Sequence, residues 1–382
     1  MSEQNFAPMV VPGTFIRVRA EGLISVGGIS TGNIGIVGTA AKGTGSTKLL
    51  SSYAEAIATF GRYDKADKAK FNLVRGLELL YASGARTVYA RAVADNTADF
   101  KAAMEEVIKE DVNIIVIPEL NIAGGTGSLG ILGGIASAAE GQNKDLIAVV
   151  GSEKATAADV VGDVSKNKRV VMVAPGIKVS ETFEVDDSGV EVAPDAVLTD
   201  EQLAAVTTKT GGVTHKGNYS AACVAGLMAS LAPHASPTNK VLAAVPDLDQ
   251  LYSYAELEQL LKAGVVPLER RGGTRVVRGI TTDVGGPFAQ ITTRRIVDQV
   301  KAGVRQVGEA FVGRLNNERV RAALKGAVQG FLDRLINDEA LVSYSLDVSA
   351  TRDEQIAGMA RVDMLLQPTF NIDYLAVTIN LE

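Results

Sequence analysis

Residues Asn371-Ile-Asp-Tyr-Leu-Ala-Val-Thr-Ile-Asn-Leu381 alternate apolar and more polar side chains, as a β-strand does. Leu375, Val377, Ile379 and Leu381 fall on one face, and Tyr374 begins the other. A strand at a chain terminus needs a sheet edge to pair with, because an open edge exposes backbone donors and acceptors. We therefore expect this strand to be donated to another subunit.

A possible acceptor for such a strand lies just before it. Two short stretches alternate in the same way around a polar loop at residues 349–358. The pattern predicts a hairpin over residues 341–348 and 359–367 with one apolar face. The residues expected to accept a neighbour's strand are Val342, Tyr344, Leu346, Val362 and Met364.

Two amphipathic helices are predicted before the hairpin. Apolar residues recur at helical spacing from Ile296 to Phe311, and again from Val320 to Leu335. Asn316 or Asn317 is suited to cap the second helix. Two helices on a small sheet would make a compact α/β interaction domain.

The middle of the chain predicts an α/β sheet. Short apolar strands, such as residues 112–117, 145–150 and 168–174, alternate with helical segments. Nearly continuous apolar strands of this kind are typical of a parallel sheet covered on both faces. The acidic residues 178–210 interrupt the alternation and predict an exposed hairpin or loop excursion.

Composition bounds the class of protein. Of the 382 residues 46% are hydrophobic and 21% charged, which is ordinary for a soluble globular protein. No apolar run has the length of a membrane span and no signal pattern opens the chain, so we expect cytoplasmic assembly. The single cysteine, Cys223, excludes an intrachain disulfide framework and is expected to be buried.

Basic residues are concentrated near the predicted helix pair. Residues 265–336 carry thirteen Lys or Arg against six Asp or Glu, although the net charge of the chain is −6. Arg294, Lys301 and Arg305 share one flank of the first helix, and Arg321 and Lys325 share a flank of the second. A solvated face explains each of these residues singly. A nucleic-acid surface is not favoured, because neither interleaved aromatic residues nor a known motif accompanies them.

Several segments together resemble the contractile tail sheath proteins of phages and related injection systems. The resemblance covers most of the chain in order and spacing. It is densest in Leu257-Glu-Gln-Leu-Leu-Lys-Ala-Gly264, in Arg278-Gly-Ile-Thr-Thr282 and in Leu341-Val-Ser-Tyr-Ser-Leu-Asp347. Nearer the start it includes Val11-Pro-Gly-Thr-Phe-Ile16, Asn33-Ile-Gly-Ile-Val-Gly38 and Tyr53-Ala-Glu-Ala-Ile-Ala-Thr-Phe-Gly61.

The resemblance implies a domain plan. We expect an N-terminal arm at residues 1–20, an α/β outer region at 21–265, a C-terminal α+β inner domain at 266–370 and an arm strand at 371–382. Strands from two different neighbours would complete the hairpin of a third subunit as a four-stranded sheet. The residues of the two donated strands would be Thr14, Ile16, Val18, Tyr374, Leu375, Val377, Ile379 and Leu381.

The resemblance also implies a function. Subunits would stack as hexameric rings around a tail tube and contract to drive the tube through a target envelope. Expected partners are other copies of the chain, the tube protein, and baseplate and terminator proteins, with no nucleic acid or membrane. The tube-facing candidates are Arg294, Lys301, Arg305, Arg321 and Lys325.

Two motifs and the few metal-ligating side chains bear on an enzymatic alternative. Gly125-Thr-Gly-Ser-Leu-Gly130 matches a dinucleotide-binding pattern, with Glu153 after the next strand, but residues 118–123 separate it from the preceding strand. Ser220 precedes Cys223 on a small-residue helix, yet no histidine or aspartate motif of a serine protease accompanies it. Two histidines, His215 and His234, and one cysteine make a metal site improbable. We expect no catalytic residue, cofactor or metal; the remaining alternatives are a nucleotide-dependent α/β enzyme and another self-assembling tail protein.

Overall fold

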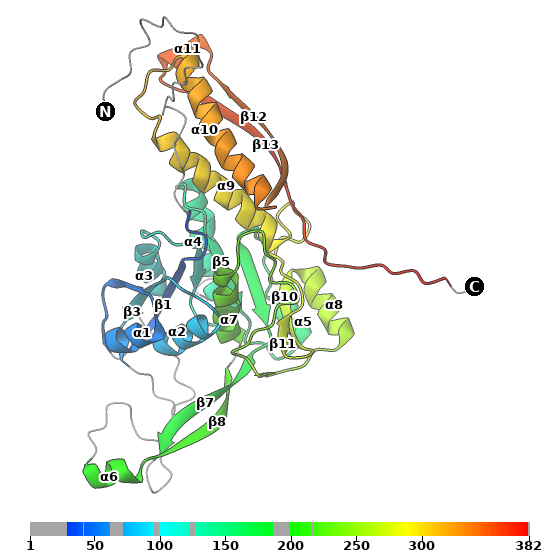
Figure 1. Cartoon of the computed structure of the whole chain (residues 1–382). Coiled ribbons are helices and arrows are strands. Elements are labelled where there is room, and N and C mark those ends of the chain that lie inside the picture. The colour runs from blue at the N-terminus through cyan, green and yellow to red at the C-terminus, as the bar shows by residue number, and fades with distance from the viewer. Residues whose placement is uncertain are drawn as a thin grey trace, which may run out of the picture.

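The computed structural model describes residues 29–40, 42–61, 72–94, 99–122, 127–185, 199–215 and 217–380. The molecule is elongated (Figure 1). A central α/β unit carries a helix pair with a two-stranded sheet at one end and a projecting hairpin at the other. The predicted N-terminal arm, with Thr14, Ile16 and Val18, lies outside the described residues, as does Leu381.

The central unit is built on an eight-stranded sheet in the order β11-β10-β6-β5-β4-β1-β3-β2. All neighbours from β10 to β3 pair in parallel, and the two edge strands, β11 and β2, pair antiparallel. The predicted parallel α/β class is confirmed. The strands are β1 Ile34–Thr39, β2 Thr47–Leu50, β3 Val88–Val93, β4 Ile114–Val116, β5 Ile147–Gly151, β6 Val170–Ala174, β10 Val265–Arg270 and β11 Thr274–Val276.

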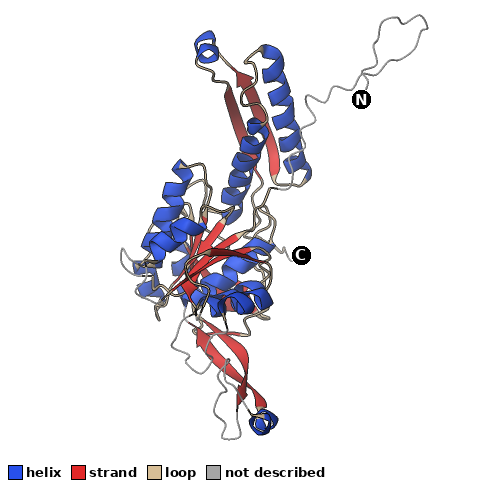
Figure 2. Ribbon diagram, turned by 90° about the vertical axis from the view of Figure 1, so that its left-hand side faces the viewer, coloured by secondary structure: helices blue, strands red, loops and turns tan. Residues whose placement is uncertain are grey.

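Helices cover both faces of this sheet, so its inner strands are buried on each side (Figure 2). The helices α1 Tyr53–Phe60, α2 Leu73–Ala82 and α7 Gly217–Ser230 contribute to one apolar cluster. The opposite cluster takes residues from α3 Phe100–Val107, α4 Ser128–Gly141, α5 Ala157–Gly162 and α8 Tyr254–Ala263. Several of these helices start where the sequence supplies a cap; Ser253, for example, forms a capping box with Glu256.

Helix α7 packs through small residues, as its sequence predicts. A Cβ added at Gly226 would lie 2.6 Å from the carbonyl oxygen of Leu80, so glycine permits the close approach of α7 to α2. Ser220 and Cys223 are fully buried in this contact region. Burial raises the pKa of the Cys223 thiol to about 12, which keeps it protonated and unreactive at neutral pH.

A hairpin leaves the central unit at the end opposite the helix pair (Figure 1). Strands β7 Ile177–Val185 and β8 Thr207–His215 pair antiparallel along their whole length, and β9 Asp247–Leu248 joins at the base of β7. The helix α6 Asp200–Ala205 precedes β8. A hairpin was expected over the acidic residues 178–210, although residues 186–198 lie outside the described part.

The C-terminal unit consists of two long helices against a hairpin. It contains α9 Ile291–Glu309, α10 Glu318–Asn337, β12 Leu341–Ser349, α11 Arg352–Ile356 and β13 Arg361–Pro368. The side chain of Asn317 caps α10 by accepting a hydrogen bond from the Val320 amide. Gly303 lets the helices meet, because a Cβ there would lie 2.1 Å from Cζ of Phe331. The predicted helix pair and hairpin are present.

Two features of the fold differ from the sequence-based plan. Strand β2 was not predicted; it pairs antiparallel with β3 at the sheet edge. The proposed boundary between residues 265 and 266 falls at the start of β10. Because β10 pairs with β6 and β11 pairs with β10, residues 266–276 belong to the central sheet and not to the C-terminal unit.

Candidate assembly surface

The hairpin of the C-terminal unit is a sheet of two strands only. β12 and β13 pair with each other, and neither has a second partner strand among the described residues. One face is covered by α9 and α10 through the half-buried residues Tyr344, Leu346, Met364 and Leu366. The two outer edges therefore offer backbone donors and acceptors for added strands.

The predicted acceptor residues lie mainly on the covered face. Tyr344, Leu346, Val362 and Met364 are half-buried. Val342 is different: the register shifts between Leu341 and Ser343, and the Val342 side chain is 56% exposed. This irregularity removes Val342 from the strict alternation that its prediction assumed.

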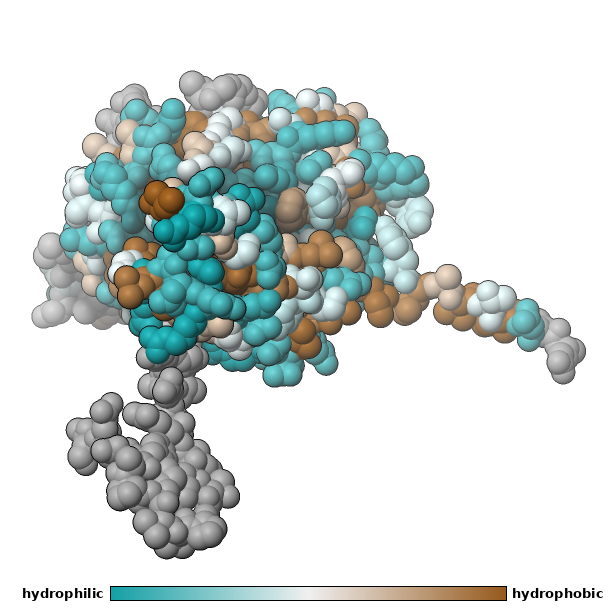
Figure 3. All heavy atoms as spheres, turned by 90° about the horizontal axis from the view of Figure 1, so that it is seen from above, coloured by the Kyte–Doolittle hydropathy of each residue, from teal (hydrophilic) through white to brown (hydrophobic). Residues whose placement is uncertain are grey.

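An extended arm follows the hairpin. Residues 374–380 form no ladder with any described residue, and Figure 3 shows a line of apolar side chains along the arm beyond the body of the molecule. Leu375, Val377 and Ile379 are 84%, 78% and 77% exposed. Exposed apolar side chains in a row with strand alternation mark a binding segment. Donation of this segment to another subunit stays a prediction.

The base of the arm, in contrast, is fixed to the chain. Asp373 Oδ2 accepts hydrogen bonds from Arg278 Nε at 2.8 Å and from Gln290 Nε2 at 3.1 Å. The amide of Asn371 donates to Gln290 Oε1 at 3.2 Å, and the Arg278 guanidinium lies 5.3 Å from the centre of the Tyr374 ring. We call these contacts of Asn371, Asp373 and Tyr374 with Arg278 and Gln290 the arm clamp.

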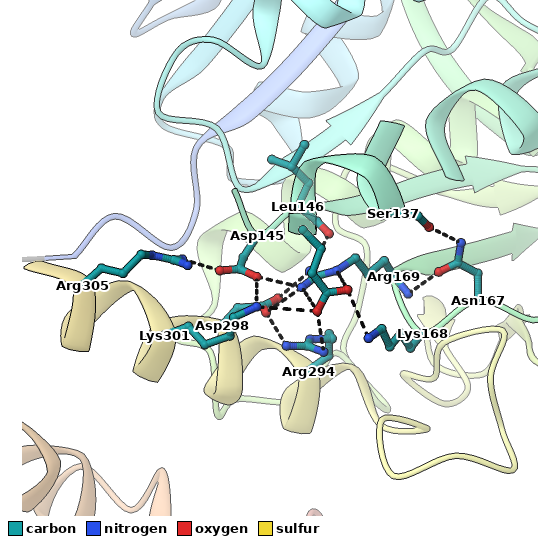
Figure 4. A network of polar contacts seen from close by, with 11 residues as sticks. Ser137, Asp145, Leu146, Asn167, Lys168, Arg169, Arg294, Asp298, Lys301 and Arg305 are labelled. Carbon is teal, nitrogen blue, oxygen red and sulfur yellow. Dashed lines mark hydrogen bonds and ion pairs between the residues drawn. The ribbon is translucent and has the colours of Figure 1, made fainter. Parts of the chain in front are cut away.

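A second polar cluster joins α9 to the central unit (Figure 4). Its centre is Arg169, whose side chain is fully buried just before β6. Arg169 donates to Glu140 Oε2 at 2.9 Å, to Asp145 Oδ1 at 2.8 Å and to Asp298 Oδ2 at 3.2 Å. A buried guanidinium needs such partners, because an uncompensated buried charge is strongly destabilising.

Helix α9 supplies the other half of this cluster. Asp298 also pairs with Arg294, and Asp145 accepts from Lys301 and Arg305. Lys168 completes the set by pairing with Glu140 at 3.1 Å. We call this cluster the junction network; its members are Glu140, Asp145, Lys168, Arg169, Arg294, Asp298, Lys301 and Arg305.

The carboxylates of the junction network have pKa values that are shifted in different directions. Hydrogen bonds from Arg169 hold the pKa of Glu140 well below its usual range. Burial alone would raise the pKa of Asp145, but hydrogen bonds from Lys301 and Arg305 lower it overall. Burial raises the pKa of Asp298, and the attraction of Arg294 and Arg169 opposes the rise only in part. On balance the ionised form is favoured at Glu140 and Asp145, whereas at Asp298 burial outweighs the attraction of the two arginines.

The network corrects the interpretation of three basic residues as tube-facing. Arg294 is 1% exposed and stacks 4.1 Å from the centre of the Phe288 ring, so it faces the interior of the chain. Lys301 and Arg305 are about two-thirds buried against Asp145 of the central unit. Their common helix flank was recognised from the sequence, but the surface it meets was not. Arg321 and Lys325 lie on α10 and bond to Asn316 and Asp347 of the C-terminal unit.

Another buried arginine of α9 fixes the same junction without a carboxylate. Arg295 is 4% exposed and donates to the backbone carbonyls of Thr31, Leu231 and Ala232. Two of these acceptors follow the end of α7, where helix carbonyls lack partners within the helix. Burial lowers the pKa of Arg295 to about 10, which still leaves it charged at neutral pH. Sequence reasoning missed this residue, because nothing local distinguishes it from Arg294.

The enzymatic motifs do not assemble into a site in the part of the chain that the structure describes. Gly125 and Thr126 lie outside the described residues. Glu153 Oε2 accepts a hydrogen bond from the Ile122 amide at 3.0 Å and so supports the loop after β4. The described residues contain no cluster of three His, Cys, Asp or Glu side chains that could hold a metal ion. None of the described helices is both long and apolar enough to cross a membrane.

The fold defines a class: an α/β protein with an attached unit of two helices and a two-stranded sheet, followed by an extended arm. Residues 283–382 match the family described as the phage tail sheath C-terminal domain. No curated protein matches the chain by sequence. The family match begins just before α9 and includes the helix pair, the hairpin and the arm.

Solved structures resemble the chain over nearly its whole length. The anti-feeding prophage helical sheath in the contracted state superposes with a TM-score of 0.71 at 16% identity, covering 98% of this chain and 100% of that one. The sheath complex of the extracellular contractile injection system PVC, also contracted, gives a TM-score of 0.69 at 13% identity and covers 98% of each chain. The crystal structure of a sheath tail protein from Desulfitobacterium hafniense gives 0.59 at 12% identity, covering 94% of this chain and 100% of that one.

These comparisons confirm the resemblance that the sequence predicts. Residues 283–382 match the phage tail sheath C-terminal domain family, and the fold of the whole chain is similar to that of contractile sheath proteins.

Proposed function

We propose that this chain is the structural subunit of a contractile tail sheath. The observation that carries the proposal is the pairing of two features in the matched domain. Neither edge of the β12–β13 sheet has a further strand among the described residues, and the following arm presents Leu375, Val377 and Ile379 to solvent. Each copy thus offers both an acceptor and a strand to be accepted.

In the proposed particle, subunits form stacked hexameric rings around a tail tube. The arms connect neighbours by backbone pairing, which is directional and tolerates many side chains. The connections then persist while the α/β units change neighbours during contraction. The energy for contraction would be held in subunit packing, since two packings of one chain can differ by a few kcal/mol.

The proposed role is non-enzymatic, and its partners are further copies of the chain, a tail tube, and baseplate and terminator proteins. The solved relatives come from a helical sheath and from sheath and baseplate assemblies, which supports these partners. Arg321 and Lys325 on α10 remain the candidates for tube contact, because the junction network engages the basic residues of α9. Assembly would take place in the bacterial cytoplasm, and the product would be a tail or an injection-system particle.

The test compares the full chain with a truncation before Asn371 by negative-stain electron microscopy, each alone and with purified tube. Sleeve-like polymers of the full chain that are lost on truncation support the proposal. Circular dichroism and thermal unfolding check that the truncated chain is folded. Uniform small particles from the full chain, both alone and with tube, would contradict it.

A further inference from the structure

The exposed arm has a competitor for its neighbour's sheet, namely the hairpin of its own chain. β13 ends at Pro368 and the alternating arm begins at Tyr374, so residues 369–373 connect the two. Connections of this length are common in antiparallel hairpins. Folding back would bury the arm on the open edge of its own β13 and would consume both the strand and an acceptor edge.

The connecting residues are held in a path that does not turn back. The amide of Thr369 donates to the Ala340 carbonyl at 3.1 Å, and its hydroxyl donates to the Glu339 carbonyl at 2.7 Å. The arm clamp then ties Asn371 and Asp373 to Gln290 and Arg278, next to the start of α9. Figure 1 shows the arm leaving the base of the C-terminal unit away from β12 and β13.

The contacts of Asp373 in the arm clamp are nearly buried and charge-assisted. The Asp373 side chain is 7% exposed although it lies five residues past Pro368, the last residue of β13. Its Oδ2 accepts from a guanidinium and from an amide, and charge-assisted hydrogen bonds of this kind are stronger than neutral ones. Immediately beyond the clamp the chain becomes exposed, from Leu375 onward. Along the chain, the acceptor hairpin therefore comes first, the clamp residues Asn371 and Asp373 follow it, and the strand to be donated comes last.

We propose that the arm clamp is a positioning device that prevents each subunit from pairing its C-terminal strand with its own hairpin. Arg278 and Gln290 hold Asp373 and Asn371, so that the arm is directed to a second copy of the chain. The inference rests on the proposed sheath function and adds to it the residues that keep donation between chains ahead of closure within one chain.

Disulfide trapping distinguishes the two pairings. Thr378→Cys on the arm is combined with Ser345→Cys or, separately, with Asp363→Cys, which are exposed positions on β12 and β13. Native Cys223 is fully buried and does not compete. On a non-reducing gel, pairing between chains gives a ladder of oligomers, whereas pairing within a chain gives a monomer of altered mobility. The trapping is done in the full chain, with Asp373→Asn or Arg278→Gln added.

With the clamp intact we expect a ladder of disulfide-linked oligomers on the non-reducing gel. With either clamp variant we expect the ratio of within-chain to between-chain product to rise about tenfold, the ratio that the loss of one charged hydrogen bond produces. The control is Asp247→Asn, which breaks an exposed pair with Arg270 at 3.2 Å and should leave the ratio unchanged. Equal ratios in the clamp variants and the control would overturn the clamp but leave donation standing. An absence of ladders at both cysteine pairs in every background would overturn donation and the clamp together.

Discussion

The eight-stranded sheet and the two-stranded sheet of this chain differ in how much of each sheet the same chain covers. Helices bury both faces of the large sheet, and antiparallel strands close its parallel interior at each edge. The small sheet has one face covered by α9 and α10, and no other strand in the described part of the chain pairs with either of its edges. The large sheet is covered by its own chain, whereas the small sheet is supported by helices on one face only and can accept further strands at its edges.

The difference assigns separate tasks to the two units. In the central unit, helices of the same chain cover both faces of the sheet. In the C-terminal unit, the edges of the small sheet can still pair with added strands. The junction network and Arg295 connect α9 to the central unit, so buried polar contacts join the two units. Variants that act on one unit and not on the other can break or sharpen this comparison.

The largest effect is expected on assembly from the apolar face of the arm. The triple variant Leu375→Ser, Val377→Ser, Ile379→Ser should raise the concentration needed for polymer formation by at least about a thousandfold, since each burial contributes about 1.5 kcal/mol or more. The melting temperature of the monomer should not change, because all three side chains are exposed there. Sedimentation velocity measures the first quantity and calorimetry the second.

The matched control for the arm changes its other face. Ala376→Ser with Thr378→Ser keeps the alternation and should assemble as the natural chain does. If the control and the triple variant lose assembly equally, the apolar face does not carry the pairing. If neither loses it, the small sheet is completed by something other than this arm.

The next largest effect is expected at the junction between the two units. Arg169→Met leaves Glu140, Asp145 and Asp298 without their shared buried partner, and should lower the free energy of unfolding by about 3–5 kcal/mol. Lys168→Met is the control, because its side chain is 43% exposed and its pair with Glu140 contributes at most about 1 kcal/mol. Urea unfolding measures both. Equal, small losses would show that the units are not held by this network.

A smaller effect is expected within the C-terminal unit. Gly303→Ala forces a Cβ against the Phe331 ring and should lower the free energy of unfolding of this unit by about 1–3 kcal/mol. Gly308→Ala, in the same helix, meets no atom within 4 Å and should be neutral or stabilising by up to about 1 kcal/mol. Thermal unfolding of the two variants separates helix contact from helix propensity. If Gly303→Ala were more stable than the natural chain, α9 and α10 would be able to move apart without loss of folding free energy.

Much of this architecture follows from local patterns. The helical repeat of Ile296, Val300 and Val307 predicts α9 and the face that it buries. The pair Asn316 and Asn317 predicts the start of α10, and Asn317 is the residue that caps it. Alternation from Tyr374 predicts an extended segment whose apolar face has no cover in the chain, and that exposure is observed. Each of these depends on neighbours in sequence, which periodicity reports directly.

The remaining features depend on contacts between distant segments. Lys301 lies 156 residues from Asp145, and no local signal tells that the basic flank of α9 meets carboxylates of the central unit. Strand β10 joins the central sheet because β6 is its neighbour in space. The irregular register beside Val342 is likewise invisible to alternation, since one extra residue in a ladder leaves the sequence pattern intact. Which charged side chains are buried, and which strands pair, could therefore be learned only from the structure.

The smallest expected effect concerns the pH dependence of the junction. The folded-state pKa of Glu140 lies below its unfolded value of 4.5, so its contribution to stability is complete above that pH and is lost as the pH falls through the folded pKa. Asp145 acts in the same sense, whereas Asp298, with a raised pKa, binds a proton more readily when folded and offsets part of the loss. Glu140→Gln should therefore flatten the decline of stability between about pH 5 and about pH 3.

Urea unfolding at a series of pH values measures this slope in the natural chain and in two variants. Glu258→Gln is the control, because Glu258 pairs with Lys262 on the surface of α8 and its pKa is also lowered, by the hydrogen bond from that lysine. A surface pair is screened by water, so its removal should hardly alter the slope. A flatter slope for Glu140→Gln alone places the acid sensitivity at the contact between the two units. The same slope in all three chains would place it elsewhere, and the junction would then hold by packing and by the buried arginines without help from the ionised state of Glu140.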